Sequence, residues 1–414
     1  MVPVTAHSRP LLIQGLSPEI ELLLCCARPY LDRETLHRAR RLVEAPVDWG
    51  TLIAAAVSQD VLPLVYHNLT TACGAVIPEG IRVSLDRYVA RSAARYARCA
   101  EALVGVLHRL EAEGISALPF KGCVLAAEAY QEPAHREFQD LDFLIHRRDA
   151  ARAKEALTAA GYRLETIVKL NGAPAHDYEY RFVHDRDALA VELCWRITLR
   201  HSLASLDLDR LRARGTVTVC GTAVPTLAPE EQLLVVCVHG SKHAWLILRW
   251  LCDVAALLQR FPALDWERLR ERARATGCWR AVALGLHLAR EWLGVPLPEP
   301  VRTAVARERG IGPAAAMVGE RLFQGDGGIA AAKQTRFHRH LAERLRDRLW
   351  IELFPLLHGL YDLITPSERD RAAVRLPSTL GGLYYALRPV RLLAQYGGAP
   401  LRRAWPRRKL LKPQ

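Results

Sequence analysis

The sequence lacks several patterns that would assign it to a common class of protein. Its ten cysteines are scattered, and no two stand in the C-x-x-C spacing of zinc or redox sites. It contains no G-x-S-x-G elbow, no G-x-G-x-x-G fingerprint after an apolar run and no Walker A loop. These absences argue against serine-hydrolase, Rossmann and P-loop chemistry, and we expect the thiols to be reduced.

Long apolar runs are also missing. Stretches such as "LLVVCV", Leu233 to Val238, are far shorter than the roughly 20 residues that a membrane-spanning helix needs. The first residues lack a basic segment followed by a long apolar one, so no secretion signal is expected. The sequence therefore predicts a cytoplasmic protein without a transmembrane segment.

Basic residues exceed acidic ones. The 57 Lys and Arg against 44 Asp and Glu give a formal net charge of +13, and the tail from Arg402 to Pro413 has no acid. An excess of this sign favours an anionic partner without choosing among nucleotide, nucleic acid, anionic lipid and acidic peptide. A solvated end is the simplest interpretation of the tail, and membrane-surface or RNA contact is the alternative.

The chain divides into three regions by pattern. Residues 1–114 and 229–414 show apolar residues at helical spacing, and the second of these ends in the basic tail. Residues 115–228 carry short β-type runs, among them "SALPFK", "DLDFLI", "YEYRFVHD" and "LAVELCW", with a helix from Asp149 to Gly161. We predict an α+β fold, in which a small mixed sheet with helices on one face is flanked by the two helical regions.

Two carboxylates interrupt the apolar run "DLDFLI". Residues i and i+2 of a strand point to the same face, so Asp140 and Asp142 project together. Such a pair repels itself unless a hard cation lies between its members, and two Mg²⁺ ions with Glu192 as third carboxylate would complete a phosphoryl-transfer site. A capped turn or an exposed strand face is the alternative for the pair, and an ion pair with an arginine is the alternative for Glu192.

Lys121 and Gly122 precede this strand and begin the short helical run "CVLAAEAY". A glycine there lets the backbone approach a phosphate, the helix N-terminus favours anions, and a lysine adds positive charge for a triphosphate. The alternative is an ordinary lysine at the end of a strand.

Together these motifs resemble a known family. The ordered set of K-G, an arginine, D-x-D and V-E-L-x-W, followed by "HGSKHAWLILRWLCDVAALL", is similar to the bacterial uncharacterised nucleotidyltransferase family of the DNA polymerase β-type superfamily. The resemblance covers most of the chain. It implies magnesium, a nucleoside triphosphate with ATP as the expected one, and transfer of a nucleotidyl group to a small-molecule or peptide acceptor.

The resemblance also implies roles for single residues. Asp140, Asp142 and Glu192 would be metal ligands, and Lys121, Gly122, Cys123 and Arg136 would lie at the phosphates. Cys123 replaces the usual serine of the phosphate turn, and Cys194 replaces a common histidine.

The helix after Pro229 supplies the remaining candidates. Lys242 and His243 could reach the nucleotide from it, whereas the pair His239 and His243 has zinc-compatible spacing but lacks the acid of a zinc protease. A non-catalytic nucleotide- or nucleic-acid-binding protein with the same fold is the alternative function, and nucleic acid is the less favoured partner.

Overall fold

The structure is a computed structural model that describes residues 15–165, 179–184, 189–198, 205–209, 211, 213–324, 331–353, 365 and 382–396. Contacts along the chain separate two compact units. The larger one covers residues 1–168 and 175–348, and the smaller one covers residues 169–174 and 349–414. The boundaries predicted at residues 114 and 228 stay a prediction.

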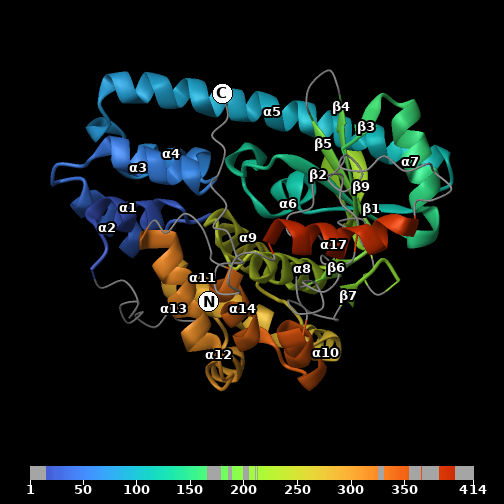
Figure 1. Cartoon of the computed structure of the whole chain (residues 1–414). Helices are drawn as coiled ribbons and strands as arrows, with labels where there is room; N and C mark the ends of the chain where they lie inside the picture. The colour runs from blue at the N-terminus through green and yellow to red at the C-terminus, as the bar shows by residue number, and fades with distance from the viewer. Residues whose placement is uncertain are drawn as a thin grey trace. The chain divides into compact units, whose positions relative to one another are not determined.

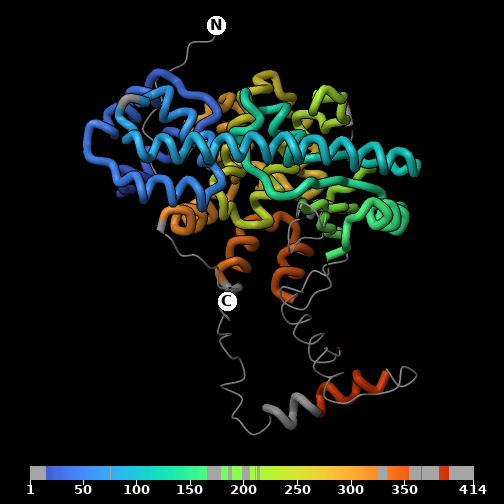
Figure 2. Tube along the Cα trace, turned by 90° about the horizontal axis from the view of Figure 1, so that it is seen from above, coloured from blue at the N-terminus to red at the C-terminus, as the bar shows by residue number. Residues whose placement is uncertain are grey.

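The N-terminal part of the larger unit is helical, as its pattern predicts. The side chain of Asp48 accepts a hydrogen bond from the backbone N of Thr51 at 3.0 Å and so caps a helix. The last helix of this part is 34 residues long and runs from the other N-terminal helices to the sheet (Figures 1 and 2). The helices are α1 (Pro18–Cys26), α2 (Arg33–Leu42), α3 (Trp49–Ser58), α4 (Leu62–Cys73) and α5 (Glu79–Ala112), with the 3₁₀ turn η1 (Gly74–Val76) after α4.

A five-stranded mixed sheet forms the middle of this unit. Its strand order is β1-β2-β5-β4-β3, and β2 and β5 are its parallel pair, while β1–β2, β5–β4 and β4–β3 are antiparallel. The α+β fold class is therefore confirmed. The elements are β1 (Ala117–Phe120), α6 (Gly122–Ala129), η2 (Pro133–His135), β2 (Asp140–Ile145), η3 (Arg147–Asp149), α7 (Ala150–Ala159), β3 (Tyr162–Leu164), β4 (Glu179–His184) and β5 (Ala190–Cys194).

The two faces of the sheet differ in chemistry. Leu141, Phe143 and Ile145 of β2 are fully buried in a core shared with α5 and α7, as the alternation predicts. The opposite face carries Leu144, which is buried in the core of the larger helical cluster, together with the two aspartates of β2. Helices therefore pack against both faces, whereas the sequence predicted one, because the alternation of polar and apolar residues in β2 ends after the D-x-D segment and Leu144 adds an apolar side chain to the aspartate face.

Two β-ribbons lie outside this sheet. The predicted β-type run "TVTVCGTAVPT" folds as a hairpin, because Cys220 and Gly221 both have positive φ, 48° and 76°, as a tight type I′ turn requires. The ribbons pair β6 (Ile197–Thr198) with β7 (Ser205–Leu206) and β8 (Ala213–Val219) with β9 (Thr222–Leu227).

The helices after Pro229 complete the larger unit, and they share one apolar core with α1 to α4. The first of these helices, α8 (Pro229–Lys242), ends just before Ala244 and Trp245, whose φ values of 50° and 54° are not helical. The indole of Trp245 fills the space beside Gly240, where an added Cβ would lie 2.6 Å from the ring. The helices are α8 (Pro229–Lys242), α9 (Arg249–Arg260), α10 (Trp266–Thr276), α11 (Trp279–Leu293), α12 (Glu299–Ala306), α13 (Ile311–Gln324) and α14 (Ala331–Leu341).

Of the smaller unit, the structure describes chiefly helix α17 (Tyr384–Tyr396), which contains Pro389. The basic tail from Arg402 to Pro413 lies outside the described residues. No helix in the described ranges has the length and apolarity of a membrane-spanning segment. The predicted cytoplasmic location stays a prediction.

Candidate active site

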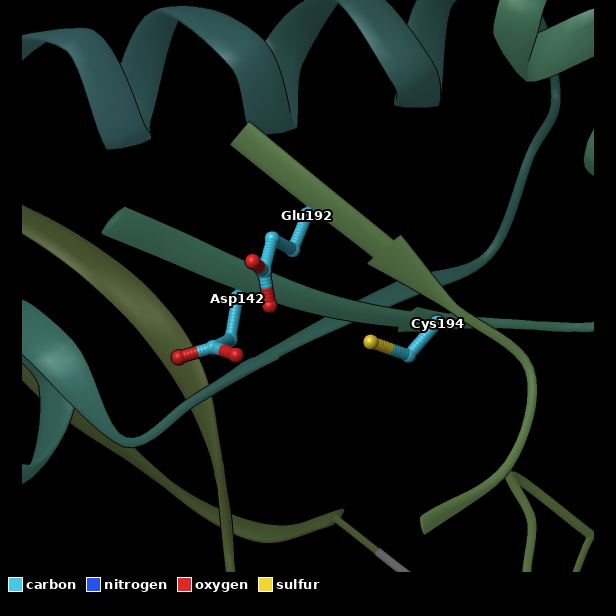
Figure 3. A group of neighbouring side chains, drawn as sticks. All are labelled: Asp142, Glu192 and Cys194. Atoms are coloured by element: carbon cyan, nitrogen blue, oxygen red, sulfur yellow. The ribbon is translucent and has the colours of Figure 1, made fainter. Parts of the chain in front are cut away.

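The polar face of the sheet brings two acids together. Because β2 and β5 are parallel neighbours, Asp142 stands in register with Glu192, and Asp140 lies two positions earlier along β2, opposite Ala190. The two carboxylates point toward one another, with the thiol of Cys194 beside them (Figure 3). One ligand atom from each of these three side chains lies within 4.8 Å of the others. This spacing is compatible with a bound cation.

Burial and mutual repulsion make these acids hard to ionise. Asp142 is 4% exposed, and burial raises its pKa to about 7, helped by the charges of Asp140 and Glu192 and opposed by Lys121. Burial also raises the pKa of Glu192, with further contributions from Asp140 and Glu179. A cation placed between the two carboxylates would relieve both effects.

Lys121 forms an ion pair with one member of this acidic group. Its Nζ donates to Asp142 Oδ1 at 2.8 Å and stands 3.5 Å from His239 Nδ1. Burial alone would lower the pKa of Lys121, but Asp142 and Asp140 outweigh it and raise that pKa above its usual value. Burial also lowers the pKa of His239 far below its usual value, so the ring is neutral and its Nδ1 can accept from the ammonium.

The turn between β1 and α6 has an unusual backbone. Lys121 has φ 56° and ψ −144°, and Gly122 has φ 38°. A Cβ on Gly122 would lie 3.3 Å from the carbonyl oxygen of Asp140, so a larger residue would crowd the start of β2. Cys123 is fully buried in the core, which leaves only its backbone to face a phosphate.

Arg136 belongs to a different network from the one predicted for it. Its Nε and Nη2 donate to the two oxygens of Asp253 on α9, at 2.7 and 2.8 Å. Its Nη1 donates to the carbonyl oxygen of Gly122 at 3.3 Å, and Tyr130 Oη also donates to Asp253, at 2.8 Å. The guanidinium is buried and stabilises the turn through the Gly122 carbonyl oxygen. It does not present free donors to a phosphate.

The sequence of residues 45–294 shows which family the chain belongs to. A profile of the proteins described as uncharacterised nucleotidyltransferases matches residues 45–294, more than half of the chain. The chain belongs to this nucleotidyltransferase family. The match confirms the family that the K-G, D-x-D and V-E-L-x-W motifs predicted.

Other comparisons of this nucleotidyltransferase add little. No curated protein matches it. Among solved structures, it is similar to the lincomycin-bound lincosamide antibiotic adenylyltransferase LnuA, with 15% sequence identity over 38% of this chain and 94% of that chain, at a TM-score of 0.26. At that TM-score, the likeness to LnuA says nothing about the substrate of this chain.

The acidic group also has neighbours that the sequence did not single out. Arg181 on β4 donates to Glu192 at 3.0 Å and to Glu165 at 2.8 Å, so the alternative of an arginine pair holds for Glu192 together with its place in the acidic group. Cys194 donates weakly to Glu179, with 3.9 Å between Sγ and Oε2. Glu179 and Arg181 alternate along β4 as Asp140 and Asp142 do along β2, and this period of two was the available signal.

Lys242 and His243 lie at the C-terminal end of α8, next to the same group. Lys242 is close enough to Glu179 to lower its pKa, although burial makes the net shift of Glu179 upward. The ring of His243 packs against those of His239 and Trp250, with centroids 4.9 and 5.4 Å away. No described group of zinc ligands includes either histidine. Lys242 therefore lies near the acidic strands, and the contact of Lys242 and His243 with a nucleotide stays a prediction.

Proposed function

We propose that this nucleotidyltransferase moves a nucleotidyl group from a nucleoside triphosphate, with ATP as the expected donor, to a small molecule or peptide. The observation that carries the proposal is the in-register pair Asp142 and Glu192, with Asp140 beside it, facing the turn at Gly122. Family membership supports the reaction class, and the geometry supports the place.

The donor set suits a divalent cation. Asp142 is buried and Glu192 is half-buried, and the raised pKa values of both show that the pair is short of positive charge. Carboxylate oxygens are the ligands that Mg²⁺ prefers. Asp142 and Glu192 would hold the ion, and Asp140 would contribute to a second one. Such ions, when bound, neutralise a triphosphate and stabilise the attacking and leaving oxygens.

Other residues of the chain bind and orient the nucleotide. The backbone at Gly122 and Cys123 starts α6, and its free N–H groups can donate to phosphate oxygens. Arg136 and Asp253 hold that turn in place through the Gly122 carbonyl. Lys242 and His243 would approach the nucleotide from α8.

The experiment compares the wild-type protein with Asp142→Asn in a transfer assay that uses α-labelled ATP, Mg²⁺ and a lysate of the native host as the source of acceptor. We expect the labelled product to fall by roughly a thousandfold, because the cation loses a ligand that stabilises the transition state. The matched control is Asp209→Asn, the same change at a side chain that is 81% exposed; its product yield should equal that of the wild type.

Calorimetry separates this proposal from the binding-protein alternative. Binding of ATP that requires Mg²⁺ and is lost in Asp142→Asn supports nucleotidyl transfer. Unchanged product formation in that variant contradicts the proposed site. Metal-independent binding of nucleic acid with a steep salt dependence favours the alternative.

A further inference from the structure

The ammonium of Lys121 occupies one carboxylate of the group that could hold a cation. It donates to Asp142 Oδ1 at 2.8 Å, and Asp142 is one of the three side chains that converge within ligand distance. The other acid of that group, Glu192, has its own cation in Arg181, at 3.0 Å. In the structure, Asp142 is therefore neutralised by a side chain of its own protein.

The backbone of Lys121 is strained in this position. Its backbone has φ 56° and ψ −144°, a region that residues with a Cβ rarely adopt. Glycine would fit this backbone with less strain, so the conformation is compatible with a role for the side chain. The turn directs the lysine across the sheet face to β2.

We propose that Lys121 is a built-in counter-ion that neutralises Asp142 until a divalent cation binds. The ammonium of Lys121 then moves to the triphosphate and pairs with its phosphates. This inference rests on the proposed function, since it assumes a cation at Asp142 and a nucleotide at the turn. It explains how one lysine can serve both the carboxylate and the phosphates.

The charges require the exchange. The ammonium and a divalent cation would compete for the same carboxylate and repel each other at close range. The Lys121 side chain is 14% exposed. It projects from the turn that precedes α6, and phosphates would lie at the start of that helix. A cation that binds alone must displace the lysine without compensation, whereas a cation that arrives with a triphosphate gives the lysine a new partner. Cation and nucleotide should therefore bind with positive coupling.

The test measures Mn²⁺ binding by calorimetry, first without nucleotide, for the wild type and Lys121→Met. Removal of the competing ammonium should tighten Mn²⁺ binding by about tenfold. At saturating Mn²⁺, a non-hydrolysable ATP analogue should bind about tenfold more weakly to the variant, because the phosphates lose a cation. Lys121→Gln, which can still hydrogen-bond to Asp142, serves as a second neutral variant if Lys121→Met folds poorly.

The control is Lys154→Met, which removes the same charge from an exposed position on α7. It should leave both affinities within about twofold of the wild type. Mn²⁺ affinity that is equal or lower in both Lys121 variants overturns the counter-ion role while leaving the cation site intact. Absence of Mn²⁺ binding in every protein, with or without the analogue, instead overturns the proposed function.

Discussion

Two buried ion pairs flank the turn between β1 and α6, and they differ in how completely their atoms are satisfied. In the pair of Arg136 and Asp253, both carboxylate oxygens accept from the guanidinium, and Tyr130 adds a third hydrogen bond. In the pair of Lys121 and Asp142, one hydrogen bond joins the partners. The neighbouring acids of the second pair leave the group short of positive charge.

The difference separates a structural pair from a chemical one. An arginine cannot lose its proton in a protein, so Arg136 needs Asp253 in every state of the molecule. An aspartate whose pKa is about 7 can gain a proton near neutral pH, so Asp142 can exist with or without a cation beside it. We call Arg136 and Asp253 the closed pair and Lys121 and Asp142 the open pair. The closed pair fixes the turn, and the open pair is free to exchange partners.

The largest effect is expected from breaking the closed pair. Asp253→Asn leaves the Arg136 guanidinium buried without its counter-ion, and we expect the free energy of unfolding to fall by about 3–5 kcal/mol. Urea unfolding followed by circular dichroism measures the loss.

The control for this loss is Glu79→Gln, which breaks the exposed ion pair with Arg82 on α5. It should cost less than about 1 kcal/mol. Equal stabilities of Asp253→Asn and Glu79→Gln would show that the buried pair does not hold the turn.

A smaller effect is expected from breaking the open pair. Lys121→Met removes the ammonium, and Asp142 can respond by taking up a proton instead of remaining as an isolated charge. We expect a loss of roughly 1–2 kcal/mol in the free energy of unfolding at pH 7, measured in the same urea experiment. A loss as large as that of Asp253→Asn would mean that the two pairs contribute equally to the free energy of unfolding.

The smallest effect sharpens the comparison through pH. The folded-state pKa of Asp142 is raised to about 7, so its carboxylate is protonated below that pH and ionised above it. A cation competes with this proton, and its affinity should therefore rise with pH, by about tenfold from pH 6 to pH 8. Mn²⁺ titration at these two values checks the sign. In Asp142→Asn the affinity should be lower at both values, and the pH dependence attributable to this carboxylate should disappear.

Part of the site could be predicted because it is written in local patterns. The D-x-D spacing on β2 fixes that Asp140 and Asp142 share a face, and an acid inside the apolar run of β5 marks Glu192. The short β-type runs between two helical regions likewise predicted the α+β fold. These inferences need only the period of a strand and the composition of its neighbours.

The partners of these residues could not be predicted, because they are set by tertiary contacts. Nothing local to Arg136 shows that Asp253, on a helix 117 positions later in the chain, will pair with it. The same holds for Arg181 and Glu192, which meet because β4 and β5 pair antiparallel in one register. The left-handed backbone of Lys121 is imposed by the strand-to-helix turn, and no propensity of lysine indicates it.

The parallel pairing of β2 with β5 has a consequence for how the protein matures. Asp142 and Glu192 come from strands that α7, β3 and β4 separate along the chain, so the acidic group forms only when β2 and β5 have paired. A slip of β5 by one residue would turn Glu192 to the apolar face. A nascent or partly unfolded chain therefore lacks the acidic group at which we propose that the cation binds, and the proposed chemistry requires molecules in which the two strands have paired in this register.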